Sequence, residues 1–156
     1  MASLAVGDPV PDVTFQGAEG PVKLRELIGE RAIVLYFYPK DETTGCTAQA
    51  CSFRDKYQDF TDAGADVIGV STDSARSHDS FSKHHRLPFR LLTDEGGAGA
   101  KALGVKKTLG LIPGRVTFVI DPEGIIRMRW DSQLGAVRHV AEALTVVKAL
   151  AKPAAG

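Results

Sequence analysis

Apolar and polar residues follow two different periods along the chain, which together predict an alternation of strands and helices. The segment 32–39 is a continuous apolar run of strand length, rich in β-branched and aromatic residues, and it predicts a buried central strand. The segments 65–72 and 115–121 predict two further buried strands. Apolar positions spaced by three and four predict amphipathic helices between these runs. In chain order, the predicted strands are 11–15, 22–24, 32–39, 65–72, 87–92, 115–121 and 124–130, and the predicted helices are 44–62, 74–85, 98–103 and 134–150.

The order of these elements predicts an α/β fold in which helices flank a mixed central sheet. The strands at 32–39 and 65–72 are joined by one helix, so we expect them to pair in parallel. The segments 11–15 and 22–24 flank a Gly-rich turn and predict an N-terminal β-hairpin extension.

The composition predicts one globular domain over residues 1–156, with 44% hydrophobic and 24% charged residues. Nineteen basic and nineteen acidic residues cancel, so the chain lacks the basic surplus expected of a nucleic-acid or anionic-membrane partner. No apolar run approaches the ~20 residues that cross a bilayer. The N-terminus shows neither the basic nor the apolar region of a signal peptide, and the small residues at 151–156 predict a frayed tail.

The two cysteines are the candidate reactive groups. A disulfide-stapled secreted scaffold carries more cysteines in a shorter chain, so we expect these two to serve chemistry. Cys46 falls about three residues into a predicted helix, and Thr43 is a candidate N-cap whose hydroxyl would accept an amide hydrogen bond. Unpaired N–H groups and the helix dipole favour negative charge there, and the thiolate is the reactive form of cysteine.

Cys51 lies five residues after Cys46 in the same predicted helix. In an intact helix, two such residues have Cα atoms roughly 9 Å apart and lie on different faces, whereas a disulfide needs a Cα separation below about 7 Å. The pair therefore cannot form an ordinary disulfide within an unbroken helix. Its spacing also differs from the C-x-x-C of redox dithiols and zinc sites.

The segment around these residues resembles the active site of the peroxiredoxins, whose signature is P-x-x-x-T/S-x-x-C. Pro39, Thr43 and Cys46 occupy the signature positions, and the second cysteine, in GCTAQACSFRD, resembles the peroxiredoxin Q (bacterioferritin comigratory protein) subfamily. The resemblance covers nearly the whole chain, from the opening VGDPVPDVTF to GRVTFVIDPEGIIR, which brings the active-site arginine, here Arg115. One departure is Thr44, where the family often has proline, a residue that favours the first helical position.

The resemblance implies a thioredoxin-like fold and a thioredoxin-dependent, atypical 2-Cys thiol peroxidase that needs no cofactor and no metal. Cys46 would attack hydrogen peroxide or an organic hydroperoxide and become a sulfenic acid, with Thr43 and Arg115 assisting and Pro39 shielding it from water. Cys51 would then form an intramolecular disulfide, which thioredoxin or a similar dithiol reduces. With the resolving cysteine in the same chain, we expect a monomer or weak dimer in the cytoplasm or another reducing soluble compartment, organelles included.

Two alternative functions stay open on the sequence alone. A thiol redox sensor that relays oxidation to a partner would use the same Cys46 chemistry. A thioredoxin-like binding module with a vestigial thiol would not need Pro39, Thr43 and Arg115, so their presence argues against it.

Two further segments invite a ligand interpretation. His84 and His85 are candidate metal ligands, but no other His, Asp or Glu has ligand spacing to them, and a solvated helix end is predicted. The glycines at 96–104 lack the G-K-[ST] of a phosphate loop and the dinucleotide fingerprint, so they predict helix punctuation.

Overall fold

The apolar run at 32–39 forms an inner strand of the central sheet. In the computed structural model, which describes residues 4–107 and 114–151, this strand is β3 (Ala32–Phe37), and all its residues are buried. It pairs in parallel with β4 (Ala65–Ser71), as predicted, and antiparallel with β6 (Val116–Ile120). Neighbouring strands on both sides and covering layers on both faces explain why the run shows no polar alternation.

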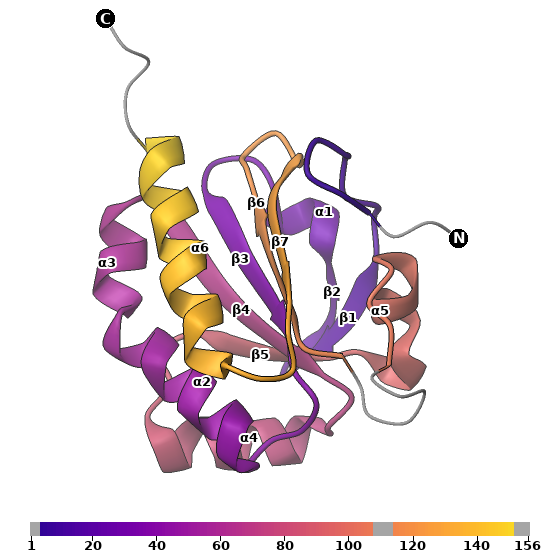
Figure 1. Ribbon diagram of the computed structural model, residues 1–156. Coiled ribbons are helices and arrows are strands. Elements are labelled where there is room, and N and C mark those ends of the chain that lie inside the picture. The colour runs from indigo at the N-terminus through magenta and orange to yellow at the C-terminus, as the bar shows by residue number, and fades with distance from the viewer. Residues whose placement is uncertain (1–3, 108–113, 152–156) are drawn as a thin grey trace, which may run out of the picture.

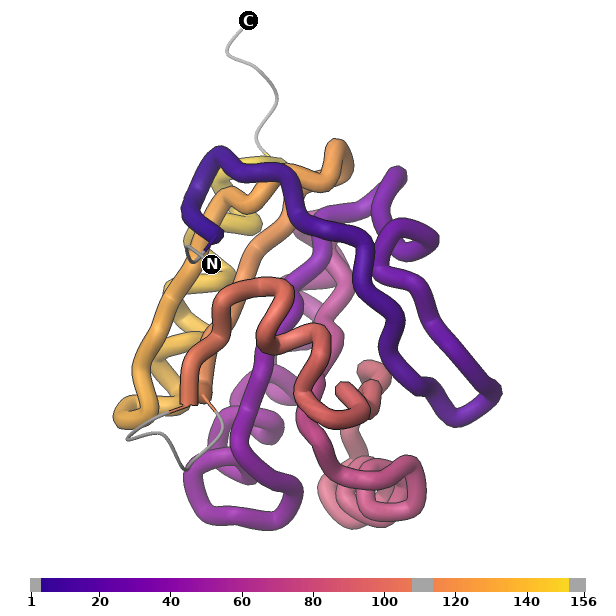
Figure 2. The backbone as a smooth tube through the Cα atoms, turned by 90° about the vertical axis from the view of Figure 1, so that its right-hand side faces the viewer, coloured from indigo at the N-terminus to yellow at the C-terminus, as the bar shows by residue number. Residues whose placement is uncertain are grey.

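Within the described residues the sheet has seven strands in the order β2-β1-β5-β4-β3-β6-β7. The pairing is mixed, because β3, β4 and β5 are parallel while the other neighbours are antiparallel. The predicted N-terminal hairpin is confirmed and extends the sheet at one edge, where Figure 2 shows it in indigo. The remaining strands are β1 (Thr14–Gly17), β2 (Gly20–Lys23), β5 (Arg90–Thr93) and β7 (Ile126–Asp131).

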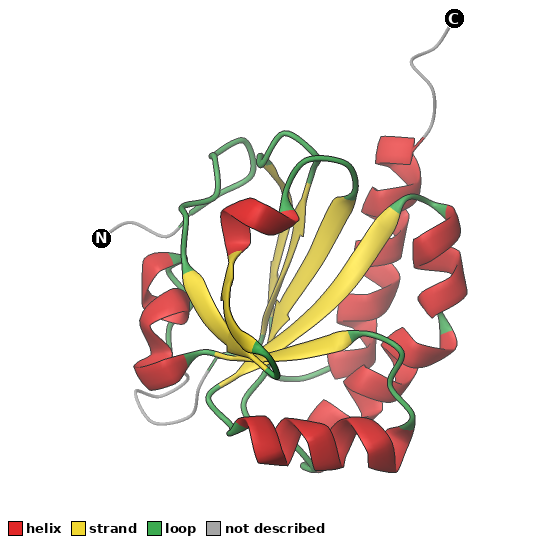
Figure 3. Cartoon of the chain, turned by 180° about the vertical axis from the view of Figure 1, so that it is seen from behind, coloured by secondary structure: helices red, strands yellow, loops and turns green. Residues whose placement is uncertain are grey.

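Helices cover both faces of the sheet (Figures 1 and 3). Four of them, α2, α3, α4 and α6, contribute buried side chains to one hydrophobic core, and α1 packs against a second core on the opposite face with α5 beside it. A 3₁₀ turn at Glu95–Gly97 precedes α5. The helices are α1 (Leu24–Leu27), α2 (Thr44–Asp55), α3 (Tyr57–Asp62), α4 (Ala75–His85), α5 (Ala98–Ala102) and α6 (Ala136–Ala151).

Successive side chains of β3 serve the two cores in turn, because strand side chains alternate between faces. Tyr36 belongs to the core under α2, and Phe37 belongs to the opposite one. The paired residue on β4 is Gly69, where an added Cβ would lie 2.9 Å from the Tyr36 hydroxyl and ring. A glycine is therefore required here so that the tyrosine ring can lie over the neighbouring strand.

The prediction of one continuous helix over 44–62 is wrong. Lys56 has φ −102° and ψ 3°, which ends α2 and starts α3. The apolar spacing runs across this break without interruption, so the pattern does not reveal it. Phe53 and Phe60 are fully buried as expected, whereas Tyr57, one residue after the break, is only half-buried.

The other predicted elements agree with the structure to within a few residues. The strand expected at 87–92 is shifted to Arg90–Thr93, and α1 and the 3₁₀ turn were not predicted. Of the expected frayed tail, Ala151 is the last residue of α6, and 152–156 lie outside the described residues. No helix in the described part of the chain is both long and apolar enough to cross a bilayer.

Candidate functional site

Cys46 lies in the first turn of α2, directly after the loop that follows β3. Thr43 has the extended backbone of an N-cap residue, and its carbonyl accepts the first helical hydrogen bond, from the Thr47 N–H at 2.8 Å. Cys46 is the third helical residue, and only 1% of its surface is exposed. Its sulfur is therefore held, out of bulk water, at the end of the helix where the unpaired N–H groups concentrate positive potential.

Arg115 reaches Cys46 because β3 and β6 are antiparallel neighbours. Phe37 at the end of β3 pairs with Val116 at the start of β6, so the residues just beyond these two ends share one edge of the sheet. The Arg115 Nη2 donates a hydrogen bond to the Cys46 Sγ at 3.3 Å, across 69 positions of sequence. The structure thus brings together two of the predicted site residues.

The Arg115 guanidinium is a buried cation without a carboxylate partner among the described residues. Its side-chain partners are the Cys46 sulfur and the neutral amide of Gln49. A buried charge is costly unless an opposite charge compensates it. Among the described side chains in contact with the guanidinium, only the Cys46 sulfur could carry an opposite charge.

Two residues of this arrangement were not predicted from the sequence. Gln49 is completely buried and its Oε1 accepts a hydrogen bond from Arg115 Nη1. Gly45 leaves room for the guanidinium, because an added Cβ would lie 3.1 Å from Arg115 Nη2. A signal for Gln49 existed: it lies three residues after Cys46 on the buried stripe of α2, where a polar side chain needs a partner.

The expected hydroxyl cap by Thr43 is wrong. Its side chain makes no capping hydrogen bond, and the Oγ1 instead donates to the Lys40 carbonyl at 2.9 Å. The hydroxyl is therefore committed as a donor within the loop but keeps lone pairs that can accept a hydrogen bond. Pro39, at the start of the same loop, is half-buried.

A buried polar network fixes this loop. Asp41 is only 4% exposed, and it accepts hydrogen bonds from the Tyr38 hydroxyl and, at 2.8 Å, from His78 Nδ1. Its backbone N–H donates to Asp73 Oδ2 at 2.8 Å. Burial opposes ionisation of Asp41, but hydrogen bonds from His78 and Tyr38 outweigh it and lower the pKa of the carboxyl. The loop before Cys46 is thus anchored to α4 through the Asp41 carboxylate and to the segment after β4 through the Asp41 backbone.

Cys51 lies in the same unbroken helix as Cys46, is half-buried, and both thiols are free. Close to them is the Tyr36 ring, which stacks on Phe53 of α2 with centroids 4.5 Å apart. The Tyr36 hydroxyl is buried without a hydrogen-bond partner among the described residues, and burial together with nearby Cys46 holds its pKa well above the ordinary value. The phenol therefore stays neutral under the helix that carries both thiols.

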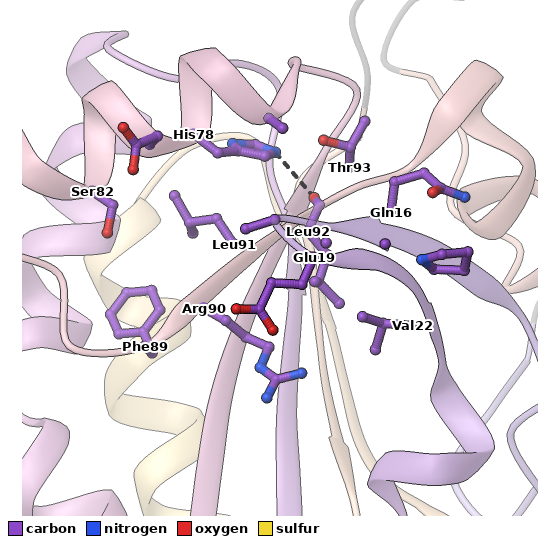
Figure 4. A pocket seen from close by; sticks show the side chains of 16 residues that line it. Gln16, Glu19, Val22, His78, Ser82, Phe89, Arg90, Leu91, Leu92 and Thr93 are labelled. Atoms are coloured by element: carbon purple, nitrogen blue, oxygen red, sulfur yellow. Dashed lines mark hydrogen bonds between the residues drawn. The ribbon is translucent and has the colours of Figure 1, made fainter.

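A separate pocket of about 530 Å³ lies between the β1–β2 hairpin, α4 and β5 (Figure 4). Gln16, Glu19 and Arg90 are among its lining residues, and His78 borders it while bonding to the Leu92 carbonyl at 3.0 Å. None of Cys46, Cys51, Thr43, Arg115 and Pro39 lines it. This pocket is therefore distinct from the thiol site.

The comparisons with known proteins agree with this geometry. Residues 6–129 match the AhpC/TSA family, so the chain belongs to this family of thiol peroxidases. The thioredoxin-like fold predicted for it is confirmed. The branch of the family is the predicted one, peroxiredoxin Q or bacterioferritin comigratory protein, and an interpretation as a mere binding module is not favoured.

The chain is 44% identical over 152 residues to the chloroplastic peroxiredoxin Q of Sedum lineare, covering 96% of this chain and 81% of that protein. It is also 44% identical over 151 residues to the chloroplastic peroxiredoxin Q of Arabidopsis thaliana, covering 96% and 69%. Among solved structures, peroxidoxin BcpB of Mycobacterium tuberculosis superposes with a TM-score of 0.86 at 34% identity, covering 94% of this chain and 98% of that one. The bacterioferritin comigratory protein of Xanthomonas campestris gives 0.82 at 33%, covering 97% and 100%.

Proposed function

We propose that Cys46 is the peroxidatic nucleophile and that the enzyme reduces hydrogen peroxide and organic hydroperoxides. The observation that carries this proposal is the 3.3 Å contact between the Cys46 sulfur and the buried, otherwise uncompensated Arg115 guanidinium. The thiolate attacks the terminal peroxide oxygen, so that an S–O bond forms and the O–O bond breaks. Sulfur is oxidised to the sulfenic acid, and the departing alkoxide or hydroxide takes a proton to leave as alcohol or water. A solved structure of the Xanthomonas campestris relative is described in terms of alkyl peroxide reduction, which supports the organic substrates.

The neighbouring groups have separate roles in this proposal. Arg115 keeps the thiolate anionic before attack and donates to the peroxide oxygens as charge develops on them. Thr43, whose hydroxyl proton is given to Lys40, accepts a hydrogen bond from the peroxide O–H and so orients the bond to be broken. Pro39 narrows the access of water to the sulfenic acid. The anchored Asp41 holds the loop in register while the bond to oxygen forms.

Cys51 is the proposed resolving cysteine. Its thiolate attacks the sulfenic sulfur of Cys46, an S–S bond forms, and the hydroxyl leaves as water. The unbroken helix keeps the two Cα atoms roughly 9 Å apart, so α2 must unwind locally before the disulfide can close. The unwound form is expected to predominate only after oxidation, when the disulfide offsets the lost helical hydrogen bonds.

The proposal also covers the reductant, the oligomeric state and the cellular compartment. A thioredoxin-type dithiol reduces the disulfide and returns the enzyme to its starting state, as the family implies in general. The whole chain forms a single domain in this proposal. Because both cysteines belong to one chain, turnover needs no second subunit, and the enzyme works as a monomer or weak dimer. Its balanced charge gives it no attraction to nucleic acid or an anionic membrane surface. A reducing compartment, either the cytoplasm or an organelle such as the chloroplast named for its relatives, meets these requirements.

The decisive experiment is peroxide turnover coupled to thioredoxin, thioredoxin reductase and NADPH, with hydrogen peroxide and an alkyl hydroperoxide as substrates. Cys46→Ser is expected to lose rapid consumption of both peroxides. The matched control is Ser52→Ala, a hydroxyl change on the same helix, which should keep wild-type turnover. Wild-type second-order kinetics in Cys46→Ser would end this assignment.

A further inference from the structure

A second group of ligand-type side chains gathers outside the thiol site, at the C-terminal end of α4. Glu42 comes from the loop before α2, and its Oε2 lies 2.9 Å from His84 Nδ1. Its Oε1 lies 2.8 Å from His85 Nε2. One donor atom from each of the three residues lies within 4.8 Å of the other two. The expectation that the two histidines form only a solvated helix end is therefore incomplete, because it overlooked a carboxylate 42 positions earlier in the chain.

The donors suit a divalent transition metal. Two imidazole nitrogens and one carboxylate oxygen are the set that binds Zn²⁺ at sites with an open fourth position. In a tetrahedral zinc site the ligand atoms lie about 3.3–3.6 Å from one another, given bond lengths of roughly 2.0–2.2 Å. The three atoms need only small side-chain rotations from their present hydrogen bonds to reach this spacing. We propose that Glu42, His84 and His85 form a binding site for a divalent transition-metal ion of the Zn²⁺ type.

Contacts with neighbouring residues hold the two histidine ligands in place. The His85 ring, only 17% exposed, packs edge-on against Phe81 with centroids 5.1 Å apart. The His85 carbonyl accepts a hydrogen bond at 2.8 Å from Arg54 of α2. The His84 and His85 rings lie side by side with their centroids 4.1 Å apart, and each ring has a nitrogen atom next to the Glu42 carboxylate. Fixing ligands through such outer contacts strengthens metal binding.

The chain offers no competing imidazole on its described surface. The sequence has four histidines, and the other two, His78 and His139, are buried and hydrogen-bonded through both ring nitrogens. Metal binding that depends on imidazole therefore reports on the proposed site, provided that the protein carries no affinity tag and its two thiols are removed.

The position of the site links it to the redox cycle. Glu42 directly precedes Thr43, the N-cap residue of α2, while His84 and His85 belong to α4. A bound ion would thus tie the start of the cysteine helix to a second helix. This coupling rests on the proposed unwinding of α2, because unwinding displaces Glu42 from the two histidines. By linkage, the metal then binds more tightly to the reduced than to the disulfide form and slows disulfide formation.

The site is tested by calorimetric titration of Zn²⁺ into untagged, full-length Cys46→Ser/Cys51→Ser protein, which cannot bind the ion through thiolates. One saturable site per chain is expected, and Co²⁺ should give a visible d–d absorption band at the same stoichiometry. Adding His84→Ala or Glu42→Gln should weaken binding by at least about tenfold. The control, Asp79→Asn, removes an exposed carboxylate on α4 that pairs with Lys83, and it should leave binding unchanged.

Absence of saturable Zn²⁺ binding, or equal binding after His84→Ala and Glu42→Gln, would overturn the site. The redox coupling has its own measurement, the Zn²⁺ affinity of the wild-type disulfide form, which has no free thiols. It should be at least about fivefold weaker than that of the double-serine protein, and equal affinities would refute the coupling. Peroxide turnover in metal-free buffer reports separately on Cys46, so that failure of either proposal is recognised without the other.

Discussion

The guanidinium of Arg115 lies against the sulfur of Cys46, with Nη2 and Sγ 3.3 Å apart. Within the described residues no carboxylate competes with the sulfur for this cation. The same sulfur atom therefore has two roles in the proposal. As a thiolate it compensates the charge of the buried guanidinium, and it is also the nucleophile.

Replacing Arg115 should lower peroxidase activity strongly. Arg115→Met removes the charge and all donors near the developing oxygen charge, and we expect the second-order rate constant to fall by about 10²–10³-fold. Arg115→Lys keeps the charge but not the planar fork that contacts Cys46 and Gln49 together, so a smaller loss is expected. Stopped-flow kinetics measure both, with Arg127→Lys, at the Asp121 ion pair, as the control. Unchanged kinetics in Arg115→Met would remove the arginine from the mechanism.

Gly45→Ala should separate activity from stability. The new Cβ would lie 3.1 Å from Arg115 Nη2 and would push the guanidinium by a few tenths of an ångström. We expect roughly tenfold slower peroxide reduction, since small misplacements of catalytic groups are costly. Helix propensity favours alanine over glycine by up to about 1 kcal/mol, so the free energy of unfolding should not fall. A variant with full activity, or one with reduced stability, would contradict this account.

Cys51→Ser should stop the cycle after its first step. Cys46 still reduces one equivalent of peroxide, but no disulfide forms, and the sulfenic acid accumulates until excess peroxide oxidises it further. Mass spectrometry should show one added oxygen atom on Cys46 after stoichiometric peroxide. Thioredoxin-coupled turnover should be largely lost. Wild-type coupled turnover would show that Cys51 is not the resolving residue.

His139 should make folding stability depend on pH. It is completely buried between the Thr117 hydroxyl and the Ser132 carbonyl, both 2.8 Å from its ring nitrogens. Burial lowers its pKa below the ordinary 6.5, and the charge of Arg115 adds to the effect although hydrogen bonding to Ser132 opposes it. His139 therefore binds a proton near pH 6.5 in the unfolded chain but stays neutral at this pH in the folded protein. The free energy of unfolding consequently falls as the pH drops below 6.5.

Urea denaturation of the wild-type protein and of His139→Gln, at several pH values between 7.5 and 5 in one buffer series, measures this loss. His139→Gln cannot take up the proton, so its stability should fall less over the same interval. Parallel pH profiles for the two proteins would show that His139 is not the source of the slope.

Amide exchange should report the unwinding of α2. Each backbone hydrogen bond lost between about residues 43 and 53 costs ~1 kcal/mol net, so the reduced helix should open rarely. In the disulfide form the same amides should exchange much faster, while those of β3 should not change. Slow exchange throughout α2 in the oxidised protein, or a disulfide-linked structure with an unbroken helix, would refute local unwinding.

Much of the fold could be predicted from the sequence because its determinants are local. The run that forms β3 is apolar at every position since both faces are covered, and this is visible without coordinates. The contact of Arg115 with Cys46 was expected from family resemblance, and the antiparallel pairing of β3 with β6 supplies its physical cause. Gln49 could also have been predicted as a buried residue that needs a partner, because it is a polar residue on the apolar stripe of α2.

Other features depend on tertiary placement that no local period encodes. The preference of the Thr43 hydroxyl for Lys40 over the helix amides depends on the turn of one loop. The meeting of Glu42 with His84 depends on how that loop and the end of α4 are positioned. Both were missed because each is decided by backbone geometry outside the elements that the pattern identifies.

The break at Lys56 has a mechanical consequence for the redox cycle. The Lys56 carbonyl accepts the Phe60 N–H at 3.1 Å, so α3 has its own first hydrogen bond and does not inherit its register from α2. Phe60 meanwhile stays fixed in the core beneath α3. In the proposed unwinding of α2, the break at Lys56 lets α3 keep its own hydrogen bonds and Phe60 its place in the core, so that the change in backbone structure ends at Lys56.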